Sequence, residues 1–298
     1  MINKNIDQII NEFVKKNKLP QSYNNMAKTY LVNITNTIYN WSLNEKKPIC
    51  IGINGAQGTG KSTLSLFIKN ILEEMKEITV EIVSIDDLYH TKNKRLKLSS
   101  DIHNLFITRG APGTHDISIG YNFINACLNN NFNNLHLPRF DKFNDDRSSK
   151  DKWLYVNNKI DIIILEGWCV GAKPQKDYEL NKPINSLEEK YDSKAIWRRY
   201  SNDQLKNKYQ SLFNLCSYLI MIKAPSFEVI YEWRLKQERV ASQKSEKNRS
   251  KAMNKEDIKF FVQHFERLSR WMMKDLPARS DILIKLNNKH LIEGVNYR

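Results

Sequence analysis

The chain changes character at residues 49–63, which read Ile49-Cys50-Ile51-Gly52-Ile53-Asn54-Gly55-Ala56-Gln57-Gly58-Thr59-Gly60-Lys61-Ser62-Thr63. The stretch begins with an apolar run, which is typical of a parallel strand that is buried on both faces. It then matches the pattern G-x-x-x-x-G-K-[ST], in which glycines let backbone N–H groups curl around a phosphate. Helical periodicity follows from Ser62 to Met75, so the positive end of a helix dipole would face the same anion. A strand, such a loop and a helix in this order predict a nucleotide-phosphate site.

The side chains of this loop suit phosphate chemistry. We expect the segment Gly55–Thr63 to bind ATP, with Lys61 bridging the β- and γ-phosphates. The Ser62 hydroxyl would ligate Mg²⁺, and Thr63 would touch the α-phosphate. The predicted cofactors are therefore ATP and Mg²⁺.

Further strands and helices alternate along the chain. Strands are predicted at Thr79–Ile85, Ile160–Leu165, Leu215–Ile222 and Ile282–Leu286, and helices near Ile119–Leu128 and at Phe227–Ala241 and Glu256–Lys274. This alternation implies right-handed βαβ units and an α/β fold with a mostly parallel sheet.

Residues 1–46 precede this pattern and read as helices. Apolar residues recur there at i, i+3 and i+4 spacing, at Ile6, Ile9, Ile10, Phe13 and Val14, and again between Met26 and Trp41. We expect an N-terminal helical extension over 1–46 that packs on the core, and one catalytic domain over 47–298.

Composition excludes several classes of protein. Of the 298 residues, 41% are hydrophobic and 27% charged, as in a globular domain. No apolar run approaches the roughly 18 residues of a membrane span, and the N-terminus lacks a signal-peptide pattern, so the expected location is the cytoplasm. The cysteines, Cys50, Cys127, Cys169 and Cys216, lack metal-ligand spacing and are expected to be buried reduced thiols.

The net charge of +14 raises the question of nucleic-acid binding. The chain has no concentrated basic arm and no helix-turn-helix or RNP-like signature. ATP and an anionic metabolite also call for local positive charge. We therefore expect ATP and a small-molecule acceptor as partners, and neither nucleic acid nor a membrane.

Carboxylates follow two of the predicted strands. Asp86-Asp87 comes after Thr79–Ile85, and Glu166 comes after Ile160–Leu165. Ligands of open α/β sheets bind beyond the carboxyl ends of the strands. One carboxylate could accept the proton of an attacking hydroxyl, while another organises Mg²⁺ through water. Asp86-Asp87 could also cap a helix, and the two roles are compatible.

Two polar clusters lie between these carboxylates. The first is Arg109-Gly110-Ala111-Pro112-Gly113-Thr114-His115-Asp116, and the second is Leu137-Pro138-Arg139-Phe140-Asp141-Lys142. Glycine and proline shape tight loops, and arginine suits bidentate contact with a carboxylate. His115 could be a structural histidine, but its polar neighbours favour a role in a site.

The phosphate loop alone is shared by kinases, GTPases and nucleic-acid motors. No Asp-x-x-Gly follows the third strand, as it would in a GTPase, and a motor needs more chain. The carboxylates and polar clusters therefore favour a small-molecule kinase.

These motifs resemble those of the D-glycerate 3-kinase family, a branch of the P-loop kinases with phosphoribulokinase, uridine kinase and pantothenate kinase. The matching segments, in order, are Gly55–Thr63, Ser84–Tyr89, Arg109–Asp116, Leu137–Lys142, Leu165–Gly171 with Lys173-Pro174, and Trp233–Leu235 with Glu238. They cover residues 48–290. Leu88 and His90 depart from the family pattern, which has an aromatic residue and often leucine there.

The resemblance implies a five-stranded sheet of order 2-3-1-4-5. It makes Asp86 the catalytic base and places Arg234 at the start of a lid, near 234–252, where it reaches the phosphates. Lys61 and Glu166 complete the catalytic set. The implied substrate-binding residues are Asp87, Tyr89, Arg109, His115, Asp116, Arg139 and Lys142.

The resulting hypothesis is transfer of the γ-phosphoryl group of ATP to a hydroxyl of D-glycerate, with Arg109 or Arg139 holding the acceptor carboxylate. One alternative is a kinase of the same architecture for a nucleoside, pantothenate or a sugar phosphate. Others are a non-catalytic ATP-binding regulatory protein and a nucleic-acid end kinase, which would bind oligonucleotides in a salt-sensitive way.

Overall fold

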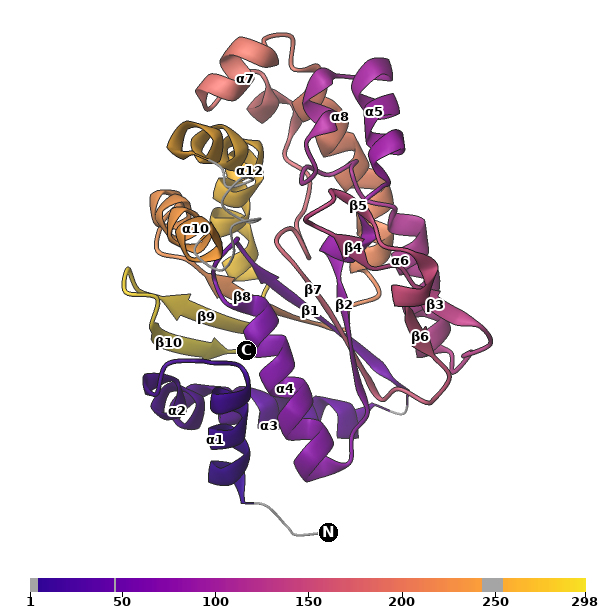
Figure 1. Ribbon diagram of the computed structural model, residues 1–298, viewed down its shortest axis with the longest axis vertical. Helices are drawn as coiled ribbons and strands as arrows, with labels where there is room; N and C mark the ends of the chain where they lie inside the picture. Colours follow the sequence, from indigo (N-terminus) through magenta and orange to yellow (C-terminus); the bar gives the residue numbers. More distant parts are fainter. Residues whose placement is uncertain (1–4, 46, 243–253) are drawn as a thin grey trace.

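The computed structural model describes residues 5–45, 47–242 and 254–298 (Figure 1). The helices are α1 (Ile6–Lys16), α2 (Ser22–Met26), α3 (Val32–Asn44), α4 (Lys61–Lys76), α5 (Lys92–Asp101), α6 (Ile117–Leu128), α7 (Ser186–Tyr191), α8 (Ile196–Gln204), α9 (Gln210–Phe213), α10 (Phe227–Ser242) and α12 (Lys255–Asp275). The strands are β1 (Ile49–Gly55), β2 (Val80–Ser84), β3 (Leu135–Leu137), β4 (Phe140–Asp141), β5 (Asp146–Arg147), β6 (Leu154–Val156), β7 (Ile162–Gly167), β8 (Tyr218–Lys223), β9 (Ile282–Leu286) and β10 (Ile292–Tyr297).

The central sheet has six strands in the order β10-β9-β8-β1-β7-β2. Strands β2, β7, β1, β8 and β9 are mutually parallel. When these five strands are numbered 1 to 5 along the chain, their order in the sheet is the expected 2-3-1-4-5. The expectation of five strands is wrong in one respect, because β10 adds an antiparallel edge. Sequence patterning misses β10 because none of its residues is fully buried, so it lacks an apolar run.

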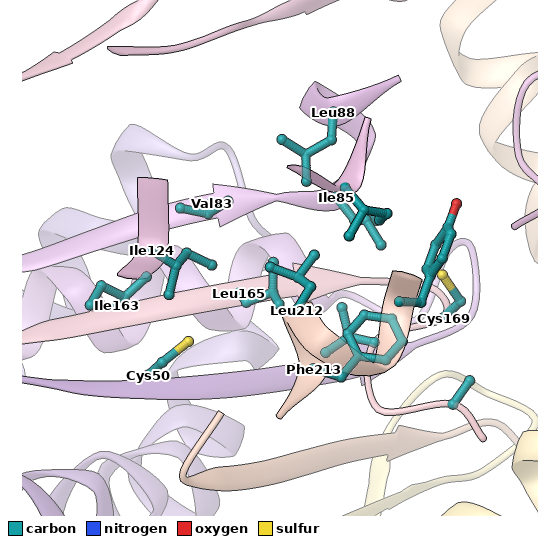
Figure 2. Packing of buried hydrophobic residues seen from close by; sticks show 14 of the residues in the cluster. Cys50, Val83, Ile85, Leu88, Ile124, Ile163, Leu165, Cys169, Leu212 and Phe213 are labelled. Carbon is teal, nitrogen blue, oxygen red and sulfur yellow. The ribbon is translucent and has the colours of Figure 1, made fainter. Parts of the chain in front are cut away.

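The two faces of the sheet carry separate hydrophobic clusters. Ile49, Ile51 and Ile53 of β1 point to one face, where they pack with α1, α3 and α4. Cys50 points to the other face, where α6, α9 and α12 cover the sheet. Figure 2 shows this second cluster, to which Cys50 of β1 and Leu212 of α9 both belong. Because both faces are covered, β1 and β7 are fully buried, as their apolar sequences predict.

The N-terminal extension is built into the first of these clusters. The buried side of α1 consists of Ile9, Ile10, Phe13 and Val14, which share the core with β1 and α4. Asn5 caps the helix together with Gln8 in a capping box. Figure 1 shows α1 to α3 alongside α4, below the sheet. The expected helical pattern of this segment is confirmed.

The region between β2 and β7 covers part of one sheet face with α6 and also supplies loops at the carboxyl edge of the sheet. It contains α5, α6 and two small antiparallel pairs, β3 with β6 and β4 with β5. The β4–β5 hairpin carries the second polar cluster of the sequence. This hairpin lies beside the 3-10 turn Ile85–Leu88 that follows β2.

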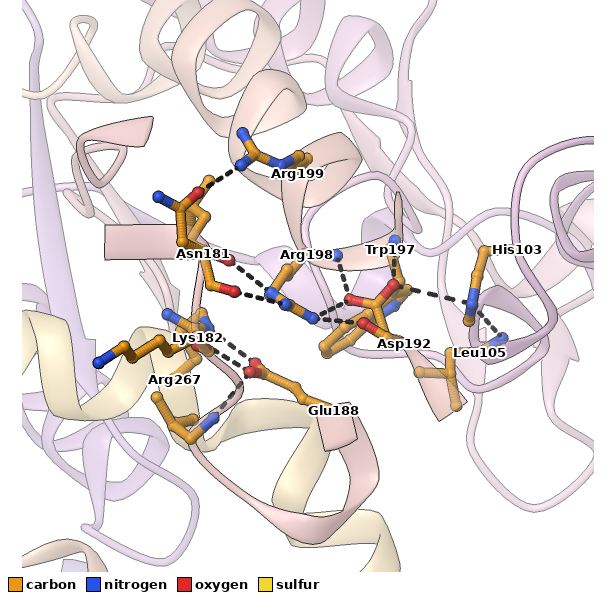
Figure 3. Close-up of polar contacts among 12 residues, drawn as sticks. His103, Leu105, Asn181, Lys182, Glu188, Asp192, Trp197, Arg198, Arg199 and Arg267 are labelled. Carbon is orange, nitrogen blue, oxygen red and sulfur yellow. Dashed lines mark hydrogen bonds and ion pairs between the residues drawn. The ribbon is translucent and has the colours of Figure 1, made fainter. Parts of the chain in front are cut away.

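Two buried ion pairs order the segment 177–205, one within the segment and one that joins it to α12 (Figure 3). Arg198 of α8 bonds Asp192 at 2.9 Å, and both side chains are essentially inaccessible to solvent. Arg267 of α12 bonds Glu188 of α7 at 2.7 and 2.6 Å. These contacts place α12, which borders the site described below.

Two remaining expectations concern the cysteines and the membrane. All four cysteines are free thiols, and Cys216 is only half-buried, with its Sγ atom 3.7 Å from that of Cys50. Among the described residues, no helix combines the length and the apolar character that crossing a bilayer requires.

Candidate active site

The phosphate loop leaves β1 and curls back into α4. Gly58 and Gly60 have φ angles of 83° and 90°, in the left-handed region that glycine tolerates best. Thr59 donates a hydrogen bond to the Ala56 carbonyl at 2.8 Å and closes the curl. A Cβ atom on Gly55 would lie 2.5 Å from the Thr59 Oγ1 atom, so this position has no room for a side chain. No side chain caps α4, whose first N–H groups are left available for an anion.

Glu166 lies directly behind the loop. It is the penultimate residue of β7, pairs in register with Ile53 of β1, and is 5% exposed. Its Oε1 atom accepts a hydrogen bond from the Ser62 hydroxyl at 3.1 Å, and its Oε2 atom is buried without a partner in the described structure. A buried carboxylate oxygen without a partner is costly unless a cation or water completes it. The Ser62–Glu166 pair therefore fits a hydrated divalent cation.

Few protein ligands are needed for such a cation. Mg²⁺ keeps several waters and is commonly held by one or two protein groups together with phosphates. Within the described residues there is no cluster of three or more histidine, cysteine or carboxylate ligands.

Asp86 lies across the site from the loop, in the 3-10 turn after β2. Its Oδ2 atom accepts a hydrogen bond from Lys142 Nζ at 2.6 Å. Burial acts to raise the pKa of Asp86, but the charges of Lys142 and Lys61 outweigh it, and the pKa lies below its ordinary value. Asp86 is therefore ionised near neutral pH and able to accept a proton.

A cavity of about 280 Å³ joins these parts. Its lining comprises Gln57, Gly58, Gly60, Lys61, Ser62, Thr63, Asp86, Tyr89, Arg109, Lys142, Arg234 and Phe261. Residues that are far apart in the sequence thus share one space at the carboxyl edge of the sheet. The electrostatics are positive, because four cationic side chains face one carboxylate.

Tyr89 and Arg109 form one wall of the cavity. Tyr89 is 3% exposed, and burial followed by the charge of Asp86 raises its pKa well above the ordinary value. Arg109 pairs with Asp145 and lies over the Phe140 ring, with 5.6 Å between guanidinium carbon and ring centroid. Both contacts hold the Arg109 side chain at the rim of the cavity.

Of the other predicted substrate residues, Lys142 also lines the cavity, whereas Asp87, His115, Asp116 and Arg139 do not. Asp87 is bound to Arg139 at 2.7 Å and to the Phe140 N–H at 3.0 Å. Asp116 is paired with Arg147 at 3.1 Å. These pairs connect the turn after β2 with the β4–β5 hairpin.

His115 occupies a buried position between two tyrosines. Its ring stacks on Tyr89 with 4.3 Å between centroids, and its Nδ1 atom is 2.6 Å from the Tyr209 hydroxyl. Burial lowers the pKa of His115 to about 3, so the ring is neutral near pH 7. The hydroxyl of Tyr209 also accepts a hydrogen bond from the Gly113 N–H at 2.9 Å. His115 thus supports Tyr89 and the Gly113 loop from behind.

Sequence reasoning missed several residues of the site. Arg95 is 1% exposed, donates to the Ile107 carbonyl at 2.8 Å, and pairs with Asp145, so it orders the loop that carries Arg109. Phe261 of α12 also lines the cavity. Neither residue stands in a motif, because Arg95 lies in a polar helix and Phe261 in an amphipathic one.

The departures from the family pattern lie outside the cavity lining. Leu88 is fully buried and packs against Gly120, where a Cβ atom would meet it at 2.5 Å. His90 is half-buried, and its backbone N–H donates to the Thr114 carbonyl at 2.8 Å. Both positions belong to the support of the turn after β2.

Arg234 enters the cavity from α10, with its guanidinium carbon 5.6 Å from the Phe261 ring centroid. The predicted lid, near 234–252, includes the polar run Gln243–Lys251, which lies outside the described residues.

A guanine-reading function has no structural support. Residues 158–161 spell Asn-Lys-Ile-Asp, the pattern that reads guanine in GTPases. They precede β7, and Asp161 Oδ2 accepts a hydrogen bond from the Thr79 N–H at 3.0 Å. This is the amino edge of the sheet, whereas the phosphate loop is at the carboxyl edge. The fold and the cavity together define a kinase of the P-loop class.

Comparisons with known proteins agree with this class. The sequence model of the KAP family P-loop domain matches residues 23–109. The uncharacterized kinase mug58 of Schizosaccharomyces pombe is 30% identical over 229 residues, which cover 74% of this chain and 79% of that protein. The chloroplastic D-glycerate 3-kinase of Arabidopsis thaliana is 26% identical over 233 residues, covering 73% and 46%.

A solved structure shows the same fold. The D-glycerate 3-kinase from Cryptococcus neoformans superposes with a TM-score of 0.74 at 20% identity, covering 90% of this chain and 99% of that one. The chain belongs to the same family of P-loop kinases as mug58, and it is also similar to the D-glycerate 3-kinase of Arabidopsis thaliana.

Proposed function

We propose that the protein transfers the γ-phosphoryl group of ATP to a hydroxyl of D-glycerate, in the presence of Mg²⁺. The observation that carries this proposal is the cavity in which the phosphate loop, Asp86 and a set of cationic side chains meet. The expected location in the cytoplasm remains part of the proposal.

The charge in the cavity favours an anionic acceptor. Lys61, Arg109, Lys142 and Arg234 line it, with Asp86 as the one carboxylate among the described lining residues. A carboxylate on the acceptor would pair with Arg109 and Lys142, whose charges are not needed to hold the triphosphate on the loop, which favours glycerate over a neutral nucleoside.

The positions of the two arginines support a choice between them as the group that holds this carboxylate. Arg109 lines the cavity, whereas Arg139 points to Asp87 behind the wall. We therefore assign the acceptor carboxylate to Arg109 and Lys142. Asp87, His115, Asp116 and Arg139 act by positioning the wall that carries Tyr89 and Arg109.

In the reaction, the acceptor hydroxyl oxygen forms a bond to the γ-phosphorus while the bond from that phosphorus to the β,γ-bridging oxygen breaks. Asp86 orients the hydroxyl and accepts its proton. Lys61 and Arg234 stabilise the charge on the transferring group and on the leaving ADP. Ser62 and Glu166, the latter through water, would hold Mg²⁺, which neutralises phosphate charge when bound.

The test is a coupled ADP-release assay with ATP, Mg²⁺ and a panel of D-glycerate, L-glycerate, pantothenate, uridine and ribulose 5-phosphate. We expect selective turnover of D-glycerate and none with neutral uridine. The Lys61→Ala variant controls for a contaminating activity and should be inactive. Turnover of another acceptor in preference to D-glycerate would contradict the substrate. ATP binding without turnover of any acceptor would favour a regulatory protein.

A further inference from the structure

A second cavity, of about 210 Å³, adjoins the phosphate loop. The N-terminal extension provides one wall, which includes Leu19, Tyr23 and Met26. The β9–β10 hairpin provides another, which includes His290 and Leu291. The extension and the hairpin come from opposite ends of the sequence, and both flank α4 (Figure 1).

The two cavities meet at the phosphate loop. Gly60 and Thr63 line both the apolar cavity and the cavity that contains Asp86. Thr63 lies in the first turn of α4, where backbone N–H groups face outward for an anion. A nucleotide with its phosphates in the polar cavity would therefore have its other end close to residues that also line the apolar one.

The chemistry of the second cavity suits an uncharged and largely apolar group. No lysine, arginine, aspartate or glutamate of the described residues lines it. Burial lowers the pKa of His290, so its ring is neutral near pH 7. Concave sites with apolar walls and a few polar groups are typical of small-ligand pockets.

His290 connects this pocket to the phosphate loop. Its Nε2 atom lies 2.6 Å from the Gly58 carbonyl oxygen, and a neutral ring makes this bond by donating. The turn before it is fixed by Asn287 Oδ1, which accepts hydrogen bonds from the N–H groups of Lys289 and Leu291 at 3.0 and 3.1 Å. The Trp233 ring of α10 meets His290 edge-on, with 4.5 Å between centroids.

We propose that this pocket takes the purine base of the nucleotide, and that the N-terminal extension is thereby part of the nucleotide site. The inference rests on the proposed use of ATP. It gives the segment 19–26 a role in nucleotide affinity and selectivity in addition to its packing on the core. Met26 is the residue to vary, because it lines the pocket and is half-buried.

The first experiment separates the base from the phosphates. Calorimetric Kd values are measured for MgATP and for inorganic tripolyphosphate with Mg²⁺. In the wild type, ATP should bind at least about tenfold tighter, which is about 1.4 kcal/mol. Met26→Trp fills the pocket and should bring the two Kd values together while tripolyphosphate binding is retained. The control Leu43→Trp, on the same extension but solvent-exposed, should keep the wild-type ratio.

The second experiment enlarges the pocket and requires a gain of function. Met26→Ala should raise the kcat/KM for N6-benzyl-ATP relative to ATP at least about tenfold. Val14→Ala, which removes buried volume from the same extension away from the pocket, should leave that ratio unchanged. A destabilised protein cannot mimic this gain, so the experiment decides the matter even where Met26→Trp fails to fold.

The outcomes separate this inference from the proposed function. Unchanged ratios in both Met26 variants, with an active wild type, would overturn the base pocket alone. A wild type that binds neither MgATP nor tripolyphosphate would overturn the phosphate cradle, and the base pocket with it.

Discussion

The substitution Arg267→Met tests whether the buried ion pairs hold α12 against the segment that carries α7. Glu188 is 0% exposed in its side chain, and Arg267 contacts both of its carboxylate oxygens. Without Arg267, the one remaining hydrogen bond to that carboxylate in the described structure comes from the Ile184 N–H, at 3.1 Å. Removing one partner of a buried pair leaves an uncompensated charge, at a typical cost of about 3–5 kcal/mol.

The variant also loses two hydrogen bonds from Arg267 to backbone carbonyls, those of Glu179 and Lys182. These carbonyls lie near the surface, where water can replace the donor, so we expect the charge to dominate. The predicted loss is therefore about 3–5 kcal/mol in the free energy of unfolding. The double variant Glu188→Met/Arg267→Met removes both charges and should recover to within about 2 kcal/mol of wild type.

Urea unfolding followed by circular dichroism measures these free energies, provided that the slope m is unchanged. Arg270→Met is the control on the same helix: Arg270 is 46% exposed and pairs with Glu228, which is 65% exposed, and with Glu266, which keeps a hydrogen bond from Asn185 in its absence. An exposed pair is worth at most about 1 kcal/mol. Equal losses for Arg267→Met and Arg270→Met, or no recovery in the double variant, would refute the reasoning.

Three further predictions concern the active site. Asp86→Asn should keep the Kd for MgATP but lower kcat by at least about 10²-fold, because the proton acceptor is lost; turnover near wild type would remove Asp86 from that role. Lys142→Met should move the acid limb of the kcat/KM profile to higher pH, because the pKa of Asp86 rises when the charge and hydrogen bond of Lys142 no longer oppose the effect of burial. Since Lys142 is 61% exposed, the shift should stay below about one pH unit, and an unchanged limb would contradict the assignment. Gly55→Ala should weaken MgATP binding at least about tenfold, because the new Cβ atom would collide with Thr59 Oγ1. The double variant Gly55→Ala/Thr59→Ala should recover part of the lost affinity. An unchanged calorimetric Kd for Gly55→Ala would show that the loop accommodates the methyl group without loss of affinity.

Much of the fold follows from local sequence patterns. The apolar run from Ile49 and the glycine-rich loop after it predict β1, the cradle and α4, since each depends on neighbouring residues alone. The amphipathic spacing in α1 predicts its buried side in the same way. Parallel order then follows from the alternation of strands and helices.

Local patterns were less informative at the exposed edge and in the polar loops. β10 has no apolar periodicity, because an edge strand with a solvated face does not need one. The sequence also did not distinguish Arg109 from Arg139 as the residue that holds the acceptor carboxylate, since both stand in glycine- or proline-containing clusters. Only the folded chain separates them, with Arg109 in the cavity and Arg139 bound to Asp87.

By itself the sequence determined the class of protein, because a phosphate loop is a contiguous segment whose chemistry lies in its own backbone and in Lys61 and Ser62. The tertiary structure alone decided which distant side chains share the cavity with it. Asp86, Arg109 and Arg234 come from different loops and helices, and their meeting depends on the order of strands and on buried ion pairs. The same holds for the apolar pocket, where the two ends of the chain come together beside the phosphate loop.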